Sequence, residues 1–195
     1  MLFRSGVLDE LAEAGFVAKD TVLNPRTWAK SRISHYRLCD NYARFYLKFI
    51  EPHVDAIKEG RFEFETLAEL PGWQTVMGLQ FENLVLNRVM DFREQLHLNG
   101  LSIRSAAPYR VGGKNGVQVD LLIQTDEVMC VVEVKRRKLI KTEIVDEVKE
   151  KIRKIRHPKA ISVRKALIFD GELPVSVRRS GYFDAIVDVG RMIKD

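Results

Sequence analysis

The stretch VQVDLLIQTDEVMCVVEVKRR, residues 117–137, decides the fold predicted for this 195-residue chain. Its two apolar runs, 117–124 and 128–136, have the length of buried strands, and the acidic pair between them can form the turn of a hairpin. The odd-numbered positions of the first run are all apolar and are expected to face one side of the sheet. The second run carries two charged residues among apolar ones, and a buried charge is costly unless something compensates it.

These two residues, Glu133 and Lys135, fall on the same face of their strand. A hairpin that turns at residues 126–127 places Asp120 directly opposite Glu133, with Cβ atoms about 4.5–5.5 Å apart. Two carboxylates this close repel each other unless a divalent cation lies between them, and oxygen ligands of this kind suit Mg²⁺ or Mn²⁺. Lys135 lies about 6–7 Å further along the face, where it can orient a water molecule or offset charge on a phosphate.

The flanking sequence predicts an α/β fold around this hairpin. Residues 75–96 carry apolar side chains in steps of three and four, which is typical of a helix, and a strand is expected at 101–107. A second helix is predicted over 142–156, followed by strands at 165–169 and 185–189. The predicted order of the core is therefore helix, three-stranded antiparallel meander, helix, strand.

The N-terminal part is expected to form two smaller units. Residues 1–37 contain a short helical pattern and two strands around the basic loop NPRTWAKSR, an order typical of the second half of a winged helix. In residues 38–74, Asp40 can cap a helix over 41–58. The chain is thus divided into a partial winged-helix-like segment, a helical connector and a domain over 75–195. The basic loop either contacts DNA or serves as a packing surface.

Composition and motifs exclude several classes of protein. The chain is 46% hydrophobic and 30% charged, which is typical of a globular protein. Cys39 and Cys130 lie far apart and outside any CxxC pair, which excludes a disulfide-built fold and argues against a zinc ribbon. No apolar segment is long enough for a membrane helix, and the acidic start lacks a signal core, so we expect a cytoplasmic protein without membrane contact. The GGKNG at 112–116 lacks the spacing of a phosphate loop.

Basic residues concentrate after the hairpin. Residues 135–165 contain 13 Lys or Arg and four acidic residues, a net +9, whereas the whole chain has a formal charge of +5. A basic stripe beside carboxylates fits a phosphate backbone that runs past a metal centre, although such a run is also typical of a solvated helix face. The candidate nucleic-acid contacts are Gln118, Arg136, Arg137, Lys138, Lys141, Lys149 and Arg153.

The acidic and basic residues of the hairpin resemble the signature of the PD-(D/E)xK nuclease superfamily. The matching pattern is Asp120, twelve intervening residues and Glu133-Val134-Lys135, after a helix. The resemblance implies a restriction-endonuclease-like core, with Asp120 and Glu133 as metal ligands and Lys135 in water activation. It also implies that Glu82, in the segment GLQFENLV, is an auxiliary ligand. The chain departs from the pattern at Val119, which stands where the family name has proline.

A narrower resemblance extends over nearly the whole chain. The segments YRLCDNYARFYLKFIEP, LPGWQTVMGLQFENLVLN, APYR, GVQVDLLIQ and GYFDAIVDV are similar to the nuclease-like C-terminal region of prokaryotic archaeal-type AAA ATPases. The resemblance implies an Mg²⁺- or Mn²⁺-dependent endonuclease that hydrolyses DNA to a 5′-phosphate and a 3′-hydroxyl, with an AAA ATPase domain or subunit as partner. The alternative is a non-catalytic nucleic-acid-binding or interaction module that works with such an ATPase.

Overall fold

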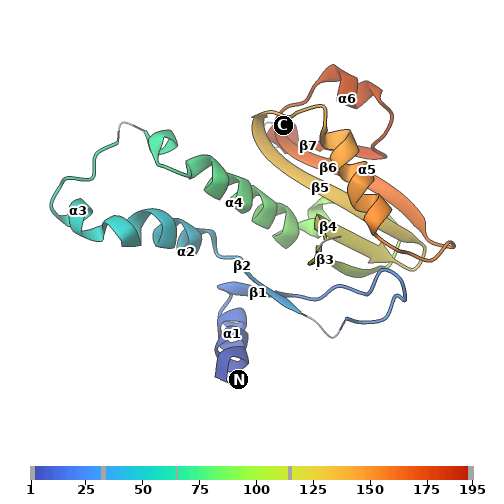
Figure 1. Ribbon diagram of the computed structural model, residues 1–195, viewed down its shortest axis with the longest axis horizontal. Helices are drawn as coiled ribbons and strands as arrows, with labels where there is room; N and C mark the ends of the chain where they lie inside the picture. The colour runs from blue at the N-terminus through green and yellow to red at the C-terminus, as the bar shows by residue number, and fades with distance from the viewer. Residues whose placement is uncertain (1–2, 32–33, 65, 114–115, 193–195) are drawn as a thin grey trace.

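A mixed sheet organises the chain (Figure 1). The computed structural model describes residues 3–31, 34–64, 66–113 and 116–192, and within these ranges the sheet has five strands. The first three strands pair antiparallel, as the sequence predicts, and the last two run parallel to the third. In spatial order the strands are β3 (Ile103–Val111), β4 (Val117–Thr125), β5 (Val128–Leu139), β6 (Ser162–Glu172) and β7 (Ala185–Asp188).

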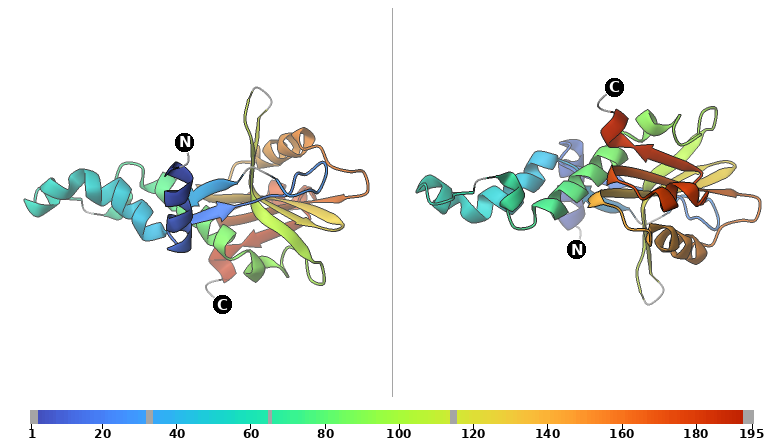
Figure 2. Two further views of the ribbon diagram at one scale, coloured as in Figure 1. Left: turned by 90° about the horizontal axis from the view of Figure 1, so that it is seen from below. Right: turned by 90° about the horizontal axis from the view of Figure 1, so that it is seen from above.

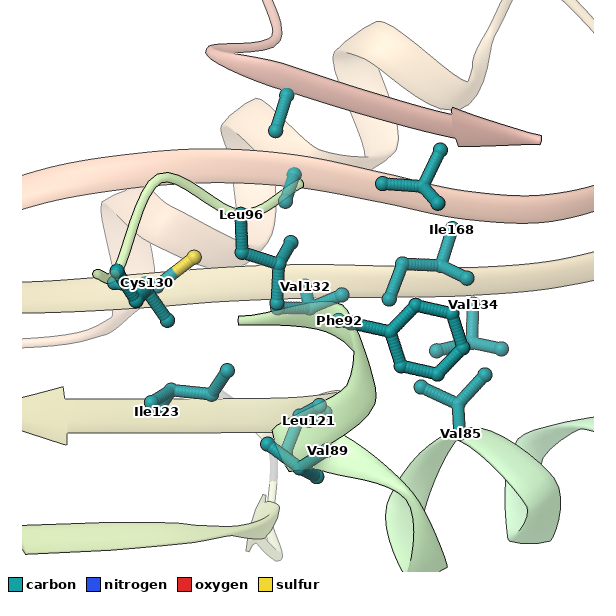
Figure 3. Packing of buried hydrophobic residues seen from close by; sticks show 14 of the residues in the cluster. Val85, Val89, Phe92, Leu96, Leu121, Ile123, Cys130, Val132, Val134 and Ile168 are labelled. Atoms are coloured by element: carbon teal, nitrogen blue, oxygen red, sulfur yellow. The ribbon is translucent and has the colours of Figure 1, made fainter. Parts of the chain in front are cut away.

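Helices cover both faces of the sheet, which makes the fold mixed α/β. One face carries α4 (Trp73–Asn87) and the short helix η4 (Val89–Phe92). Apolar side chains of these helices, among them Phe81, pack against the sheet in one core. Figure 3 shows this core from close by, with Val85, Phe92, Leu121, Ile123, Val132 and Ile168 among its labelled residues. Full burial of each such side chain stabilises the fold by about 1.5–3 kcal/mol.

The opposite face carries α5 (Ile144–Lys154) and α6 (Val175–Arg179). Ile144 and Val148 of α5 are buried against the sheet, and Val177 of α6 joins the same core. The strand residues of this second core include Val117, Val119, Leu122, Val131, Leu167 and Phe169. Two separate cores therefore hold the central strands, whose near-continuous burial follows from cover on both sides.

The prediction that all odd positions of the 117–124 run face one side is wrong. Val117 and Val119 pack on the α5 side, whereas Leu121 and Ile123 pack on the α4 side. The register against β3 shifts between these pairs, because the ladder passes from Ala107–Leu122 to Tyr109–Val119. The skipped residue of β3 is Pro108, which has no N–H to give to a ladder and is typical of bulges and edge strands.

The N-terminal residues form a small antiparallel sheet beside a helix. The elements are α1 (Phe3–Glu13), β1 (Val17–Asp20) and β2 (His35–Leu38), so the two strands expected around the basic loop are present. Residue 32 of the basic loop and residue 33 after it lie outside the described residues. In Figure 1, α1 stands away from the large sheet.

The described part of the basic loop packs against the sheet. Val22 and Trp28 join the core on the α5 side, and the Trp28 indole Nε1 donates a hydrogen bond to the Thr125 carbonyl oxygen at 2.8 Å. Leu23 N–H donates to Gln124 Oε1 at 3.1 Å. Of the two alternatives for this loop, the packing surface is therefore confirmed at Trp28, which packs on the large sheet.

The connector forms an arm that projects from the sheet (Figures 1 and 2). Asp40 caps its first helix by accepting a hydrogen bond from Ala43 N–H, as predicted. The expected span 41–58 is helical throughout, but it is not one regular α-helix, because Pro52 removes one helical donor and its ring opposes a regular turn. The observed segments are α2 (Asn41–Phe45), a π-helical turn η1 (Tyr46–Ile50), a 3₁₀ turn η2 (Glu51–His53), α3 (Val54–Lys58) and a 3₁₀ turn η3 (Leu67–Glu69).

The end of α4 also differs from the sequence expectation. The helix predicted over 75–96 ends at Asn87, where Arg88 leaves the helical region with φ −124°. The 3₁₀ turn η4 then keeps Val89 and Phe92 on the same core while the chain turns back toward β3.

The last described helix is α7 (Val189–Met192). Among the described residues, no helix combines the length and apolar character that crossing a membrane requires.

Candidate functional site

The β4–β5 hairpin has the register predicted from the sequence. Leu121 pairs with Val132 and Gln124 with Met129, which brings the next residues, Asp120 and Glu133, to the end of the paired region. There the Asp120 side chain bonds across to the neighbouring backbone, with Oδ2 accepting a hydrogen bond from Val134 N–H at 3.0 Å. The Asp120 carboxylate is therefore held beside β5, at the point where the two strands separate.

Glu133 lies between two lysines and is 0% exposed. Lys135 Nζ lies 2.5 Å from Glu133 Oε1, and Lys151 Nζ of α5 donates a hydrogen bond to Oε2 at 2.5 Å. Each oxygen of the buried Glu133 carboxylate therefore lies against one ammonium group, Oε1 against Lys135 and Oε2 against Lys151.

The charges of this cluster influence each other strongly. Burial raises the pKa of the Asp120 carboxyl, and the Glu133 charge raises it further, against the opposing effects of Lys151, the Val134 N–H and Lys135. Burial lowers the pKa of Lys135, but the Glu133 and Asp120 carboxylates more than offset this, so the pKa of Lys135 is raised. Asp120, Glu133 and Lys135 thus form one electrostatic unit, with Lys151 as a fourth member.

Glu82 on α4 lies at the margin of this unit. Burial raises the pKa of Glu82, and the Asp120 charge adds to the effect, while Arg110, Arg37 and Arg44 oppose it. Glu82 and Asp120 line the same hollow of about 570 Å³, the α4 hollow, together with Gln74, Gly78, Lys135 and Arg137. The structure therefore places the expected auxiliary carboxylate within electrostatic reach of Asp120.

The donor chemistry of the site fits Mg²⁺ or Mn²⁺, because Asp120 and Glu82 line one hollow, Glu133 lies beside Asp120, and all three offer hard carboxylate oxygens. Lys135 and Lys151 both form ion pairs with Glu133, so two positive charges already lie beside the two strand carboxylates. Within the described residues, no group of three or more His, Cys, Asp or Glu side chains is arranged to hold a metal ion. Binding of a cation by Glu133 therefore requires that at least one lysine turn away.

The expected nucleic-acid contacts divide into two sets. Gln118 lines a hollow of about 400 Å³, the hairpin hollow, with Asp120, Lys135 and Lys151. Arg136, Arg137 and Lys138 line the α4 hollow, although Arg136 also pairs with Asp170 at 3.0 Å. Lys141 lies near Lys135 and Arg137 in a smaller hollow.

The other set, on α5, is engaged elsewhere. Lys149 pairs with Asp146 at 3.1 Å and lies 5.5 Å from the Tyr182 ring centroid, and Arg153 pairs with Glu150 at 2.8 Å. Neither residue lines the α4 hollow or the hairpin hollow. The basic face of α5 is therefore only partly directed toward the site.

Lys151 is the functional candidate that the sequence reasoning missed. On α5 it follows Ile144 and Val148 in steps of four and three, so it continues the buried stripe of the helix. A lysine on an apolar stripe needs a buried partner, and the unusual acid of the neighbouring strand, Glu133, supplies it. That combination is the signal by which Lys151 could have been found.

Comparisons with known proteins do not assign this chain to a family. No protein-family model matches the sequence, and no curated protein matches it. One solved structure with a related shape is the crystal structure of protein VC1899 from Vibrio cholerae, which is 14% identical with a TM-score of 0.44. The match covers 72% of this chain and 39% of that one, so the chain spans less than half the length of VC1899. This likeness is too distant to assign a family.

Proposed function

We propose that this chain is a metal-dependent phosphodiesterase that cleaves DNA. The observation that carries the proposal is the meeting of Asp120, Glu133 and Lys135 where β4 and β5 separate, next to hollows lined by basic residues. Two buried carboxylates and a half-buried lysine are costly to place together unless they serve a reaction or a ligand. The same residues carry the sequence resemblance to PD-(D/E)xK nucleases.

The chain's own residues have distinct roles in this proposal. Asp120 and Glu133 would hold the metal, with Glu82 as an auxiliary ligand approaching from α4. A bound Mg²⁺ lowers the pKa of a coordinated water molecule and neutralises charge that develops on the phosphate. Lys135 would orient the attacking water and offset charge on the phosphate, because its ammonium lies beside Glu133 and lines both hollows next to Asp120.

The finer description of the fold belongs to the same proposal. We infer a restriction-endonuclease-like core, supported by the order α4, β3, β4, β5, α5, β6 and by the change from antiparallel to parallel pairing at β5. Association with an AAA ATPase domain or subunit is proposed from the sequence resemblance alone.

A cleavage assay tests the proposed activity. Supercoiled plasmid and branched DNA are incubated with the purified chain and Mg²⁺ or Mn²⁺, and compared with Asp120→Asn and Lys135→Ala. Asp126→Asn is the matched control, because Asp126 belongs to the turn of the same hairpin and is exposed, in an ion pair with Arg104. Cleavage by the wild type and the control, lost in both site variants, is the expected result.

The second candidate function is a non-catalytic nucleic-acid-binding module. Its specific support is the pair of lysines that already neutralises Glu133 without a metal. Metal-independent DNA binding, with no cleavage above that of Asp120→Asn in either metal, would favour this module and overturn the nuclease proposal.

A further inference from the structure

Three neighbouring hollows of the surface, together called the track, share lining residues with one another beside the candidate site. The α4 hollow and the hairpin hollow share Asp120 and Lys135. The hairpin hollow shares Val117 and Lys154 with a third hollow of about 210 Å³, the loop hollow, which lies between the basic loop and β3. A chain-like ligand that occupies the site can therefore continue past the β3–β4 hairpin along a hollowed surface.

The loop hollow is basic. Arg26, Lys154 and Arg156 line it, together with the half-buried Tyr109, and no Asp or Glu is among its lining residues. Arg26 and Arg156 are exposed, and among the described residues neither guanidinium makes an ion pair or a hydrogen bond. Two arginines without counter-charges in one hollow form a ready site for anions, because guanidinium groups bind phosphate oxygens directly.

Arg26 is presented by a fixed turn. Asn24 Oδ1 accepts a hydrogen bond from Arg26 N–H at 2.9 Å, and the Asn24 carbonyl oxygen accepts one from Trp28 N–H at 2.8 Å. Trp28 is itself tied to the sheet through its bond to Thr125. The turn is thus held before any ligand arrives, which lowers the entropic cost of binding.

Arg156 and Lys154 approach from the other side. They lie at the end of α5, next to the β3–β4 hairpin, which Figure 2 shows projecting on the α5 side of the sheet. Lys154 Nζ donates a hydrogen bond to the Gly116 carbonyl oxygen at 3.4 Å, which connects the helix end to the start of β4. Segments far apart in the sequence therefore meet around this hollow.

We propose that the loop hollow is a second phosphate-binding subsite, which holds the nucleic-acid strand that extends from the Asp120 site. This inference rests on the proposed function for its ligand, a phosphodiester backbone. Val117, which lines the loop hollow, lies three residues before Asp120, about 10 Å away at strand rise. The subsite therefore contacts phosphates a few nucleotides away from the site of reaction.

The subsite is tested by the salt dependence of binding. The affinity for a labelled 16-nucleotide DNA single strand is measured by fluorescence anisotropy without divalent metal. The wild-type chain is compared with Arg26→Ala/Arg156→Ala. Each lost phosphate contact lowers the slope of log affinity against log salt by about 0.7 for single strands, so we expect a decrease of about 1.4. The affinity ratio between the two proteins then changes about sevenfold between 50 and 200 mM salt.

Two matched variants make the result specific. Arg26→Lys/Arg156→Lys keeps both charges and should keep the wild-type slope. Arg88→Ala/Arg104→Ala removes two exposed arginines outside the track, each paired with an acid, and should also leave the slope unchanged. Equal slopes for the wild type and Arg26→Ala/Arg156→Ala would overturn the subsite, as would an equal decrease in the Arg88→Ala/Arg104→Ala control.

The outcome is separable from that of the nuclease proposal. The binding measurement needs no cleavage, so a decrease in slope supports the subsite even if the cleavage assay is negative. Conversely, cleavage that depends on Asp120 while the slope stays unchanged would leave the nuclease proposal standing and remove the subsite. Because both arginine side chains are exposed and unpaired among the described residues, equal unfolding midpoints for the variants and the wild type are expected.

Discussion

Replacing Lys151 with Met tests how far Glu133 depends on its two lysines. Glu133 is 0% exposed, and each of its oxygens lies 2.5 Å from one ammonium group. Removal of one partner of a buried ion pair costs about 3–5 kcal/mol, because the remaining charge loses its compensation. Since Lys135 stays beside Glu133 in Lys151→Met, we expect a loss of about 3 kcal/mol in the free energy of unfolding, at the low end of that range.

Thermal and urea unfolding measure this loss. In a chain of this size 1 kcal/mol shifts the melting temperature by about 2–4 °C, so Lys151→Met should melt about 6–12 °C below the wild type. Lys149→Met is the matched control on the same helix, because Lys149 is 56% exposed and its pair with Asp146 contributes about 0–1 kcal/mol.

A double variant separates charge from packing. Adding Glu133→Gln to Lys151→Met removes the buried charge together with its partner and should recover a large part of the lost stability. Equal melting temperatures for Lys151→Met and Lys149→Met would refute the reasoning. So would a double variant in which the two losses simply add.

Three further predictions concern other parts of the structure. The folded-state pKa of Asp120 is raised above its ordinary value of 3.8, so its contribution to stability is present in acid and is lost as the pH rises through the raised pKa. Asp120→Asn should therefore unfold at a higher urea concentration than the wild type at neutral pH, and the two midpoints should converge near pH 3. A difference between the midpoints that does not change with pH would contradict this prediction. Gly171→Ala should lower the free energy of unfolding by more than about 3 kcal/mol, since Gly171 has φ +136° and a Cβ there would lie 1.8 Å from the Arg137 carbonyl oxygen. Gly78→Ala, where a Cβ meets open space on α4, should instead raise the free energy of unfolding by up to about 1 kcal/mol. Equal urea midpoints for the two variants would contradict both expectations. Trp28→Phe removes the hydrogen-bond donor to the Thr125 carbonyl oxygen and should lower the free energy of unfolding by about 1–2 kcal/mol. Urea unfolding measures this loss, with Trp73→Phe as the control. A loss no larger than that of the control would show that the hydrogen bond contributes little.

The sequence predicted the hairpin well because its register follows from the turn. Once residues 126–127 turn the chain, the pairing of Leu121 with Val132 is determined, and Asp120 arrives beside Glu133. Strand alternation could not predict the bulge near Asp120, because the cause lies on a different strand. Pro108 of β3 interrupts the ladder, and the odd-numbered residues of β4 before and after Asp120 therefore face opposite sides of the sheet.

The remainder of the site depended on contacts between distant segments. Lys151 reaches Glu133 only because α5 covers this face of the sheet, and a period of hydrophobic residues alone does not say which face a helix will cover. The basic loop carried a local signal for exposure, yet the Trp28 side chain finds its partner at Thr125, far away in the sequence. Local patterns therefore predicted the elements, and tertiary packing decided which charged groups meet.

The far end of β5 has a consequence for any variant made in this region. The ladder between β4 and β5 runs to Leu121–Val132, whereas β5 itself continues to Leu139 beside β6. Strand borders of this kind can recruit an extended segment of another molecule, and lysines and arginines deter such recruitment by mutual repulsion. Arg137 and Lys138 therefore also protect against self-association, so neutral β-forming replacements there would favour aggregation, and changes to glutamine or serine are the safer way to test their contact with DNA.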